Sequence, residues 1–180
     1  DAFEHARDLE RGDDVAQVVG HRRAQGDDAH GEPVDLGFKR VEARVEDPAP
    51  GSSPPIVGVV CHPHPLHGGT MQNKVVHTLA RACQDRHVTS VRFNFRGVGG
   101  SEGRHDDGIG ESEDAAAVAD FAMRETGATH LWSLGFSFGG YVASHVAARV
   151  VAAGRAVREL VLIAPATSRF DVAPVPAGTL

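Results

Sequence analysis

The stretch that decides the fold is HLWSLGFSFGG, residues 130–140, where an apolar run passes into a glycine-rich turn. Residues 130–136 have the length and composition of a buried strand, and residues 139–153 have the apolar pattern of a helix that Gly154 ends. A serine therefore stands at a sharp strand-to-helix turn, within the pattern G-x-S-x-G. Such a turn strains the backbone of its middle residue, Ser137, and pushes that side chain outward.

The glycines around Ser137 fit this turn. Gly135 and Gly139 lie two residues before and two after it, where a side chain would clash with neighbouring backbone, and Gly140 follows. Ser137 also lies at a predicted helix N-terminus, where the dipole and free N–H groups favour developing negative charge. We therefore predict that Ser137 is a nucleophile. The alternative is a plain glycine-rich turn in which the serine caps the helix.

Outward from that turn, strands and helices alternate along the chain. Short apolar or alternating runs predict strands, and periodic apolar stripes predict helices. The predicted strands are residues 38–46, 56–61, 88–95, 130–136 and 159–164, and the predicted helices are 71–87, 113–126 and 139–153. This order predicts an α/β fold, an open and mostly parallel sheet with helices on both faces. In such sheets ligands bind beyond the C-terminal ends of the strands.

The first 32 residues differ from the rest of the chain. They hold nine acidic residues and four arginines, a net charge of −5 within the chain's total of −6, and few large apolar residues. Such a segment cannot bury enough surface to offset its ordering entropy. We expect a disordered acidic extension over 1–32 and one domain over 33–180. The nearly neutral domain lacks the basic footprint of a nucleic-acid-binding protein.

Hydrophobicity and cysteine usage predict a cytoplasmic protein without membrane contact. No run approaches the roughly 18 apolar residues of a membrane span, and no export leader precedes the domain. Cys61 closes an apolar strand, and Cys83 lies in the predicted helix 71–87, so we expect two buried thiols rather than a disulfide. The expected buried stripe of that helix is Val75, Val76, Leu79, Ala82 and Cys83.

A second informative stretch, HPHPLHGG at residues 62–69, follows the predicted strand 56–61. Acyl transfer needs two backbone N–H groups aimed at the substrate's carbonyl oxygen, together called the oxyanion hole. One normally comes from the residue after the nucleophile, here Phe138, and the other from a loop such as this one. Because the two prolines have no N–H, the second donor is His64 or Leu66, and we favour Leu66.

The same loop carries three histidines, His62, His64 and His67, which raises the question of a metal site. We expect the alternating prolines to hold the chain extended, so that neighbouring imidazoles diverge, and no acid lies in the loop to complete a ligand set. We therefore predict no metal and no cofactor. The acidic run 105–113 (HDDGIGESE) has the charge to attract a cation, but we interpret it as a solvated loop that leads into a helix.

Three stretches together resemble one family. HPHPLHGGTMQNKVVHTLARA, RFNFRGVGGSEG and LGFSFGGYVA are similar to sequences of the small bacterial α/β hydrolases, which are related to dienelactone hydrolases and serine aminopeptidase-like esterases. The resemblance covers residues 33–180 and implies an α/β-hydrolase fold. It also implies a cofactor-free serine hydrolase that acts on an ester or similar acyl bond of a small molecule. We interpret His62, Asn94 and Arg96 as supports of the cleft, with plain turn chemistry as the alternative for Asn94 and Arg96.

The catalytic partners of Ser137 are not evident. A serine needs a base, usually a histidine held by a carboxylate, and in this fold the chain order is serine, acid, histidine. After Ser137 the only histidine is His145, about 12 Å along the same helix and out of hydrogen-bond reach. Asp171 follows the last complete predicted strand, whereas in the family resembled here the acid follows the next strand, which we expect to begin at residues 178–180.

We therefore expect the chain as given to lack its acid and histidine, and to be inactive by itself. Three interpretations stay open: a fragment of an active hydrolase, which we favour, the product of a truncated gene, or a non-catalytic relative that keeps the cleft for binding. A histidine of the loop 62–69 is a further, unconventional candidate for the base.

Overall fold

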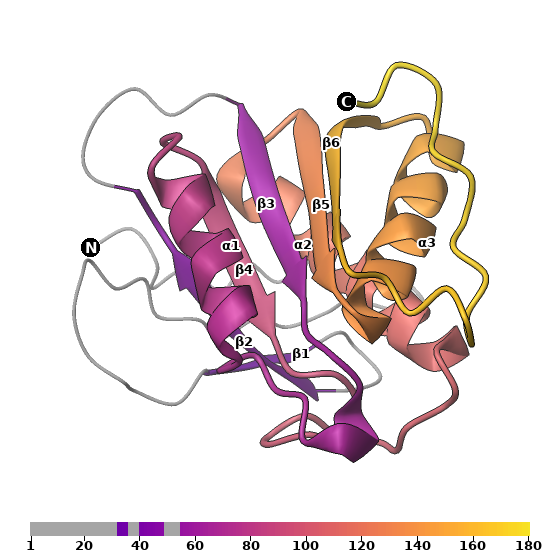
Figure 1. Ribbon diagram of the computed structural model, residues 1–180. Coiled ribbons are helices and arrows are strands. Elements are labelled where there is room, and N and C mark those ends of the chain that lie inside the picture. Colours follow the sequence, from indigo (N-terminus) through magenta and orange to yellow (C-terminus); the bar gives the residue numbers. More distant parts are fainter. Residues whose placement is uncertain (1–31, 36–39, 49–54) are drawn as a thin grey trace, which may run out of the picture.

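The computed structural model describes residues 32–35, 40–48 and 55–180, so the predicted acidic extension lies outside the described residues apart from its last position. The described strands are β1 (Glu32–Asp35), β2 (Arg40–Glu46), β3 (Ile56–Cys61), β4 (Thr89–Phe93), β5 (His130–Phe136) and β6 (Ala156–Ile163). The helices are α1 (Lys74–Gln84), α2 (Ile109–Thr126) and α3 (Phe138–Ala152), with a 3-10 turn, η1 (Pro65–His67). Figure 1 shows the strands side by side between the helices.

The strands form one sheet in the order β1-β2-β4-β3-β5-β6. β3 runs parallel to β4 and β5, and β5 runs parallel to β6, whereas β1 and β2 are antiparallel to their neighbours. Cys61 lies opposite Gly135, which lies opposite Leu162, so the C-terminal ends of β3, β5 and β6 share one edge of the sheet. The predicted α/β architecture is confirmed, and the antiparallel strand β1 is an addition to it.

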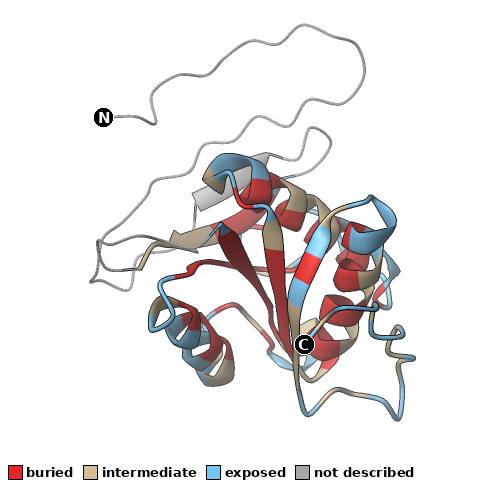
Figure 2. Ribbon diagram, turned by 90° about the horizontal axis from the view of Figure 1, so that it is seen from above, coloured by how far each residue is buried: buried red, intermediate tan, exposed pale blue. Residues whose placement is uncertain are grey.

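The helices lie on both faces of the sheet. Figure 2 shows α1 on one side of the strands and α2 with α3 on the other. The larger apolar core lies under α2 and α3 and includes Ala115, Val118, Phe121 and Ala122. The smaller core lies under α1 and contains Val76, Leu79 and Cys83. Both cysteines are buried and free, as predicted.

Two local predictions are wrong. Ala82 of α1 is exposed and Ala80 is buried in its place, because the buried stripe follows the 3.6-residue period more closely than the predicted set. Helix α2 begins at Ile109 rather than at residue 113, because Glu111 accepts a hydrogen bond from the N–H of Gly108 and caps the first turn. The run 105–113 is therefore no simple solvated loop, since the Glu111 side chain is fully buried.

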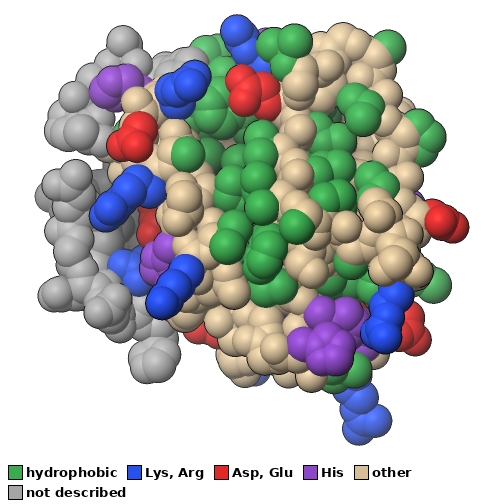
Figure 3. Space-filling view, in the orientation of Figure 1, with side chains coloured by type: hydrophobic (Ala, Val, Ile, Leu, Met, Phe, Trp, Pro, Cys, Tyr) green, Lys and Arg blue, Asp and Glu red, His purple; other side chains and the backbone are tan. Residues whose placement is uncertain are grey.

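On the face that carries α1, the sheet is only partly covered. Figure 3 shows apolar side chains at the surface beside α1, over β3, β5 and β6. Leu180 lies along the outer edge of β6, where its N–H donates to the Arg158 carbonyl at 3.0 Å and its carbonyl accepts from Leu160 at 3.1 Å. This is the hydrogen-bond pattern of two parallel strands. It occurs at residues 178–180, where the sequence predicts the next strand to begin.

Candidate active site

Ser137 stands at the turn between β5 and α3, with φ 55° and ψ −119°. A positive φ is unfavourable for any residue but glycine, so the backbone is strained as the sequence predicts. The turn is held on both sides: the Ser137 N–H donates to the Ile163 carbonyl at 2.9 Å, and the Ser137 carbonyl accepts from Gly140 at 2.9 Å. The serine is half-buried, and within the described chain no hydrogen bond holds its hydroxyl.

The glycines of the turn lie against neighbouring backbone. A side-chain methyl at Gly135 would lie well under 3.0 Å from the Gly139 carbonyl, and one at Gly139 would lie 2.5 Å from the His62 carbonyl oxygen. No side chain fits at either place. The contact of Gly139 with His62 also places the start of α3 against the beginning of the loop 62–69.

The loop 62–69 is a tight turn rather than an extended segment. Pro65 begins the 3-10 turn η1, Gly68 ends it with φ 75°, and the Gly69 N–H donates back to the His64 carbonyl at 3.0 Å. This turn brings the rings of His64 and His67 to a centroid distance of 4.9 Å. The expectation that neighbouring imidazoles diverge is therefore wrong for these two, because proline also fits the first position of a helical turn.

The two candidates for the second oxyanion donor differ in their hydrogen bonds. The N–H of Leu66 donates to Nδ1 of His64 at 3.3 Å, and the Leu66 side chain is exposed. The N–H of His64 has no hydrogen-bond partner in the part of the chain that the structure describes, and the same holds for the N–H of Phe138. The ring of His64 packs on that of Phe138, with centroids 4.8 Å apart.

His62 connects the start of this loop to the end of β4. Its ring is fully buried and packs at a tilt against the ring of Phe95, with centroids 4.2 Å apart. Nε2 accepts the Phe95 N–H at 2.9 Å, so the neutral ring carries its proton on Nδ1, which lies 2.6 Å from the Pro63 carbonyl. Burial lowers the pKa of His62 to about 4, so the ring is neutral at physiological pH.

Asn94 and Arg96 are both held by buried carboxylates. The Asn94 amide accepts the Met71 N–H at 2.8 Å and donates to Glu42 at 2.7 Å. The Arg96 guanidinium donates two hydrogen bonds of 2.7 Å to Asp114, whose side chain is fully buried. This hydrogen bonding with Asp114 raises the pKa of Arg96. Both side chains thus fasten the segment that follows β4.

A comparison with known proteins fits this geometry. Residues 66–177 match the model of a family described as the alpha/beta hydrolase fold. The chain belongs to the α/β-hydrolase family. Its match covers the strand-to-helix turn at Ser137 and the second half of the loop 62–69.

Three bacterial proteins are similar to this α/β hydrolase over much of its length. An alpha-beta serine hydrolase homologue from Coxiella burnetii is 39% identical, with a TM-score of 0.67 over 79% of this chain and 65% of that one. A structure from Xanthomonas campestris, described as an α/β serine hydrolase without a lid, is 34% identical, with a TM-score of 0.69 over 94% of this chain and 69% of that one. An uncharacterized protein of Rickettsia prowazekii is 40% identical over 111 residues, 61% of this chain and 46% of that protein.

The hydrolase chain thus spans about half of the Rickettsia protein and two thirds of the Coxiella chain.

His145 is engaged elsewhere, because its Nε2 lies 3.0 Å from the main-chain oxygen of the exposed Asp171. Among the described residues, no histidine or carboxylate hydrogen-bonds Ser137, and no group of three or more potential ligands forms a metal site. In the same residues, no helix has the length and apolar character needed to cross a bilayer.

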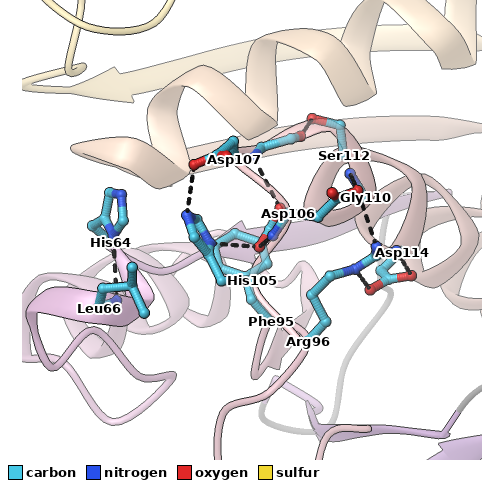
Figure 4. A network of polar contacts seen from close by, with 12 residues as sticks. His64, Leu66, Phe95, Arg96, His105, Asp106, Asp107, Gly110, Ser112 and Asp114 are labelled. Atoms are coloured by element: carbon cyan, nitrogen blue, oxygen red, sulfur yellow. Dashed lines mark hydrogen bonds and ion pairs between the residues drawn. The ribbon is translucent and has the colours of Figure 1, made fainter. Parts of the chain in front are cut away.

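Sequence reasoning missed a buried carboxylate–histidine pair in the hydrolase. Nδ1 of His105 lies 2.7 Å from the Glu111 carboxylate, which also accepts the N–H groups of Asp106 and Gly108 (Figure 4). The only signal in the sequence is the spacing of Gly108 and Glu111, which is that of a capping box. The His105 ring lies 4.8 Å from that of His64 and thus borders the site.

Proposed function

We propose that this α/β hydrolase is a serine hydrolase that cleaves carboxylic esters of small molecules through an acyl-enzyme on Ser137. The observation that carries the proposal is the strained, positive-φ conformation of Ser137 at the turn from β5 to α3. Such strain persists only where the surrounding structure imposes it, and it clusters at sites where a side chain must project from a cleft. The similarity to structures described as serine hydrolases supports the same chemistry.

In this proposal the oxyanion is held by the N–H groups of Phe138 and His64. Both are free of other hydrogen bonds in the described chain, whereas the N–H of Leu66, which the sequence favoured, already donates to the His64 ring. The contact between Gly139 and the His62 carbonyl keeps the loop beside the start of α3. Donors fixed in this way need no rearrangement when charge develops on the substrate oxygen.

The reaction is a double displacement. The Ser137 oxygen attacks the ester carbonyl, its proton passes to a base and then to the departing alcohol, and an acyl-enzyme remains. Water then hydrolyses the acyl-enzyme and restores the serine. The proposal assigns no residue as the base, because no histidine of the described chain is hydrogen-bonded to Ser137. A cytoplasmic location and a relation to dienelactone hydrolases stay predictions.

Labelling with a fluorophosphonate probe tests the proposal. We expect the probe to label the protein and Ser137→Ala to abolish the labelling, while Ser168→Ala, a change at an exposed serine on a neighbouring loop, leaves it intact. Unchanged labelling in Ser137→Ala contradicts the proposal. Complete absence of labelling favours a non-catalytic binding protein.

A further inference from the structure

Two imidazole rings lie side by side near Phe138, the residue that follows the proposed nucleophile. His64 comes from the loop after β3 and His105 from the loop before α2, and their ring centroids are 4.8 Å apart (Figure 4). Both rings also contact Phe138, the residue after Ser137, at 4.8 Å and 5.8 Å. Neither ring takes part in the reaction proposed above, which uses only the backbone N–H of His64.

Glu111 determines which nitrogen of His105 carries the proton. The Glu111 carboxylate is fully buried and accepts the N–H groups of Asp106 at 3.0 Å and Gly108 at 2.9 Å. An ionised carboxylate accepts hydrogen bonds only. Nδ1 of His105, 2.7 Å from this carboxylate, is therefore the donor nitrogen. In the neutral ring Nε2 is then an acceptor.

The N–H of Leu66 determines which nitrogen of His64 carries the proton, and the result is the opposite tautomer to that of His105. A backbone N–H can only donate, so Nδ1 of His64, which lies 3.3 Å from the Leu66 N–H, must carry a lone pair. The proton of the neutral ring is then on Nε2, which becomes a donor. Burial is the main cause that lowers the pKa of His64, which favours the neutral ring.

The acceptor nitrogen of His105 has no hydrogen bond of its own. Nε2 is buried without a hydrogen-bond partner, and the nearest carboxylate, the exposed Asp107, lies 3.5 Å from it, beyond a good hydrogen bond. The side chain of His105 as a whole is only 11% exposed. A buried, unsatisfied nitrogen is a place that a ligand or an ordered water satisfies.

We propose that His64 and His105 form a hydroxyl-binding subsite beside Ser137, in which the substrate hydroxyl donates to Nε2 of His105 and accepts from Nε2 of His64. The subsite rests on the proposed function and names its substrate class: esters whose acyl or alcohol part carries a free hydroxyl. A hydroxyl fits because it is both donor and acceptor. A carboxylate has no proton for His105 and faces Glu111 and Asp107, and an ammonium group has no lone pair for His64.

The first test measures the two tautomers in the protein as it stands. Imidazole ¹⁵N and ¹H correlation spectra at pH 8 should show His105 protonated on Nδ1 and His64 protonated on Nε2. Assignment uses the signals that disappear in His105→Phe and His64→Phe. A His105 ring that carries its proton on Nε2 overturns the proposal, because the ring then offers no acceptor.

The second test measures binding without turnover. In a Ser137→Ala background, methyl 3-hydroxybutanoate and methyl butanoate are titrated while the imidazole signals of His64 and His105 are followed. We expect the hydroxy ester to shift both signals and to bind roughly tenfold more tightly, the effect of two modest hydrogen bonds. Equal affinities, or no response of the two rings to either ester, overturn the proposal.

Matched variants separate a hydrogen bond from simple packing. His105→Phe keeps a ring among the neighbouring aromatic side chains but removes the acceptor, so the preference for the hydroxy ester should disappear, whereas His67→Phe, at an exposed ring, should preserve it. Retained preference in His105→Phe contradicts the proposal. If fluorophosphonate fails to label Ser137 while the preference persists, the proposed function fails and the subsite stands. If fluorophosphonate labels Ser137 but the hydroxy ester is not preferred, the subsite fails and the proposed function stands.

Discussion

Gly139 faces the carbonyl oxygen of His62 so closely that a side-chain methyl would lie 2.5 Å from it. Together with a still closer approach to the Cys61 carbonyl at the end of β3, it joins the start of α3, which follows the nucleophile, to the first residue of the loop after β3. The two halves of the proposed site therefore meet through backbone, which is rigid, rather than through long side chains. The geometry of the site depends on the absence of a side chain at this position.

Gly139→Ala should therefore separate the loop from the helix. We expect a loss of about 1–3 kcal/mol in the free energy of unfolding, as for other overpacked sites, together with strongly reduced fluorophosphonate labelling. Urea denaturation and labelling rates measure the two effects. The control is Gly100→Ala, where the new methyl would meet its nearest neighbour at an ordinary 3.5 Å. Equal behaviour of the two variants would contradict this account.

Ser137→Gly should change stability and activity in opposite directions. Glycine adopts a φ of 55° without the steric penalty that serine bears, although it also increases the entropy of the unfolded chain. We expect a net gain of up to about 1 kcal/mol in the free energy of unfolding and complete loss of labelling. Thermal and chemical denaturation of Ser137→Gly beside Ser137→Ala measures the strain. If the glycine variant is less stable than the alanine variant, the backbone of Ser137 is not strained.

His62 should make the protein sensitive to mild acid. Burial lowers its pKa from 6.5 to about 4, so the unfolded chain takes up a proton at a higher pH than the folded one. The contribution to stability is complete above pH 6.5 and declines as the pH falls to about 4, by up to about 3 kcal/mol. His62→Gln keeps an acceptor for the Phe95 N–H and does not titrate. Denaturation curves between pH 4 and 7 should show a shallower decline in this variant, and parallel declines would exclude His62 as the cause.

Arg96 and Asp114 should be strongly coupled. Arg96→Met leaves the fully buried Asp114 carboxylate without its guanidinium partner, which we expect to cost about 3 kcal/mol in the free energy of unfolding. Adding Asp114→Asn to Arg96→Met should recover part of that loss, because the buried charge is removed. A double-mutant cycle by urea denaturation measures the coupling. Additive single effects would show that the two side chains act independently.

The resemblance of three motifs to one family, and the alternation of apolar runs and helical stripes, were enough to predict the α/β fold. The limits of β5, residues 130–136, were predicted to the residue, because a continuous apolar run ends at a glycine-rich turn. The role of Gly135 and Gly139 also follows from the sequence, since a turn of this kind leaves no room for side chains. These features are local, so residues adjacent in the chain suffice to predict them.

The tertiary structure alone decided the surroundings of the site. The sequence favoured the Leu66 N–H as an oxyanion donor. In the fold this N–H donates to the His64 ring, because Pro65 turns the chain at that point. Glu111 belongs to a run that reads as a solvated acidic loop, yet it is buried beneath His105. The first contact is local, whereas the burial of Glu111 and the approach of His105 to His64 depend on segments that meet only when the sheet assembles. The sequence by itself therefore determined the architecture and the position of Ser137, and the contacts between loops distant in the chain determined which donors and acceptors face it.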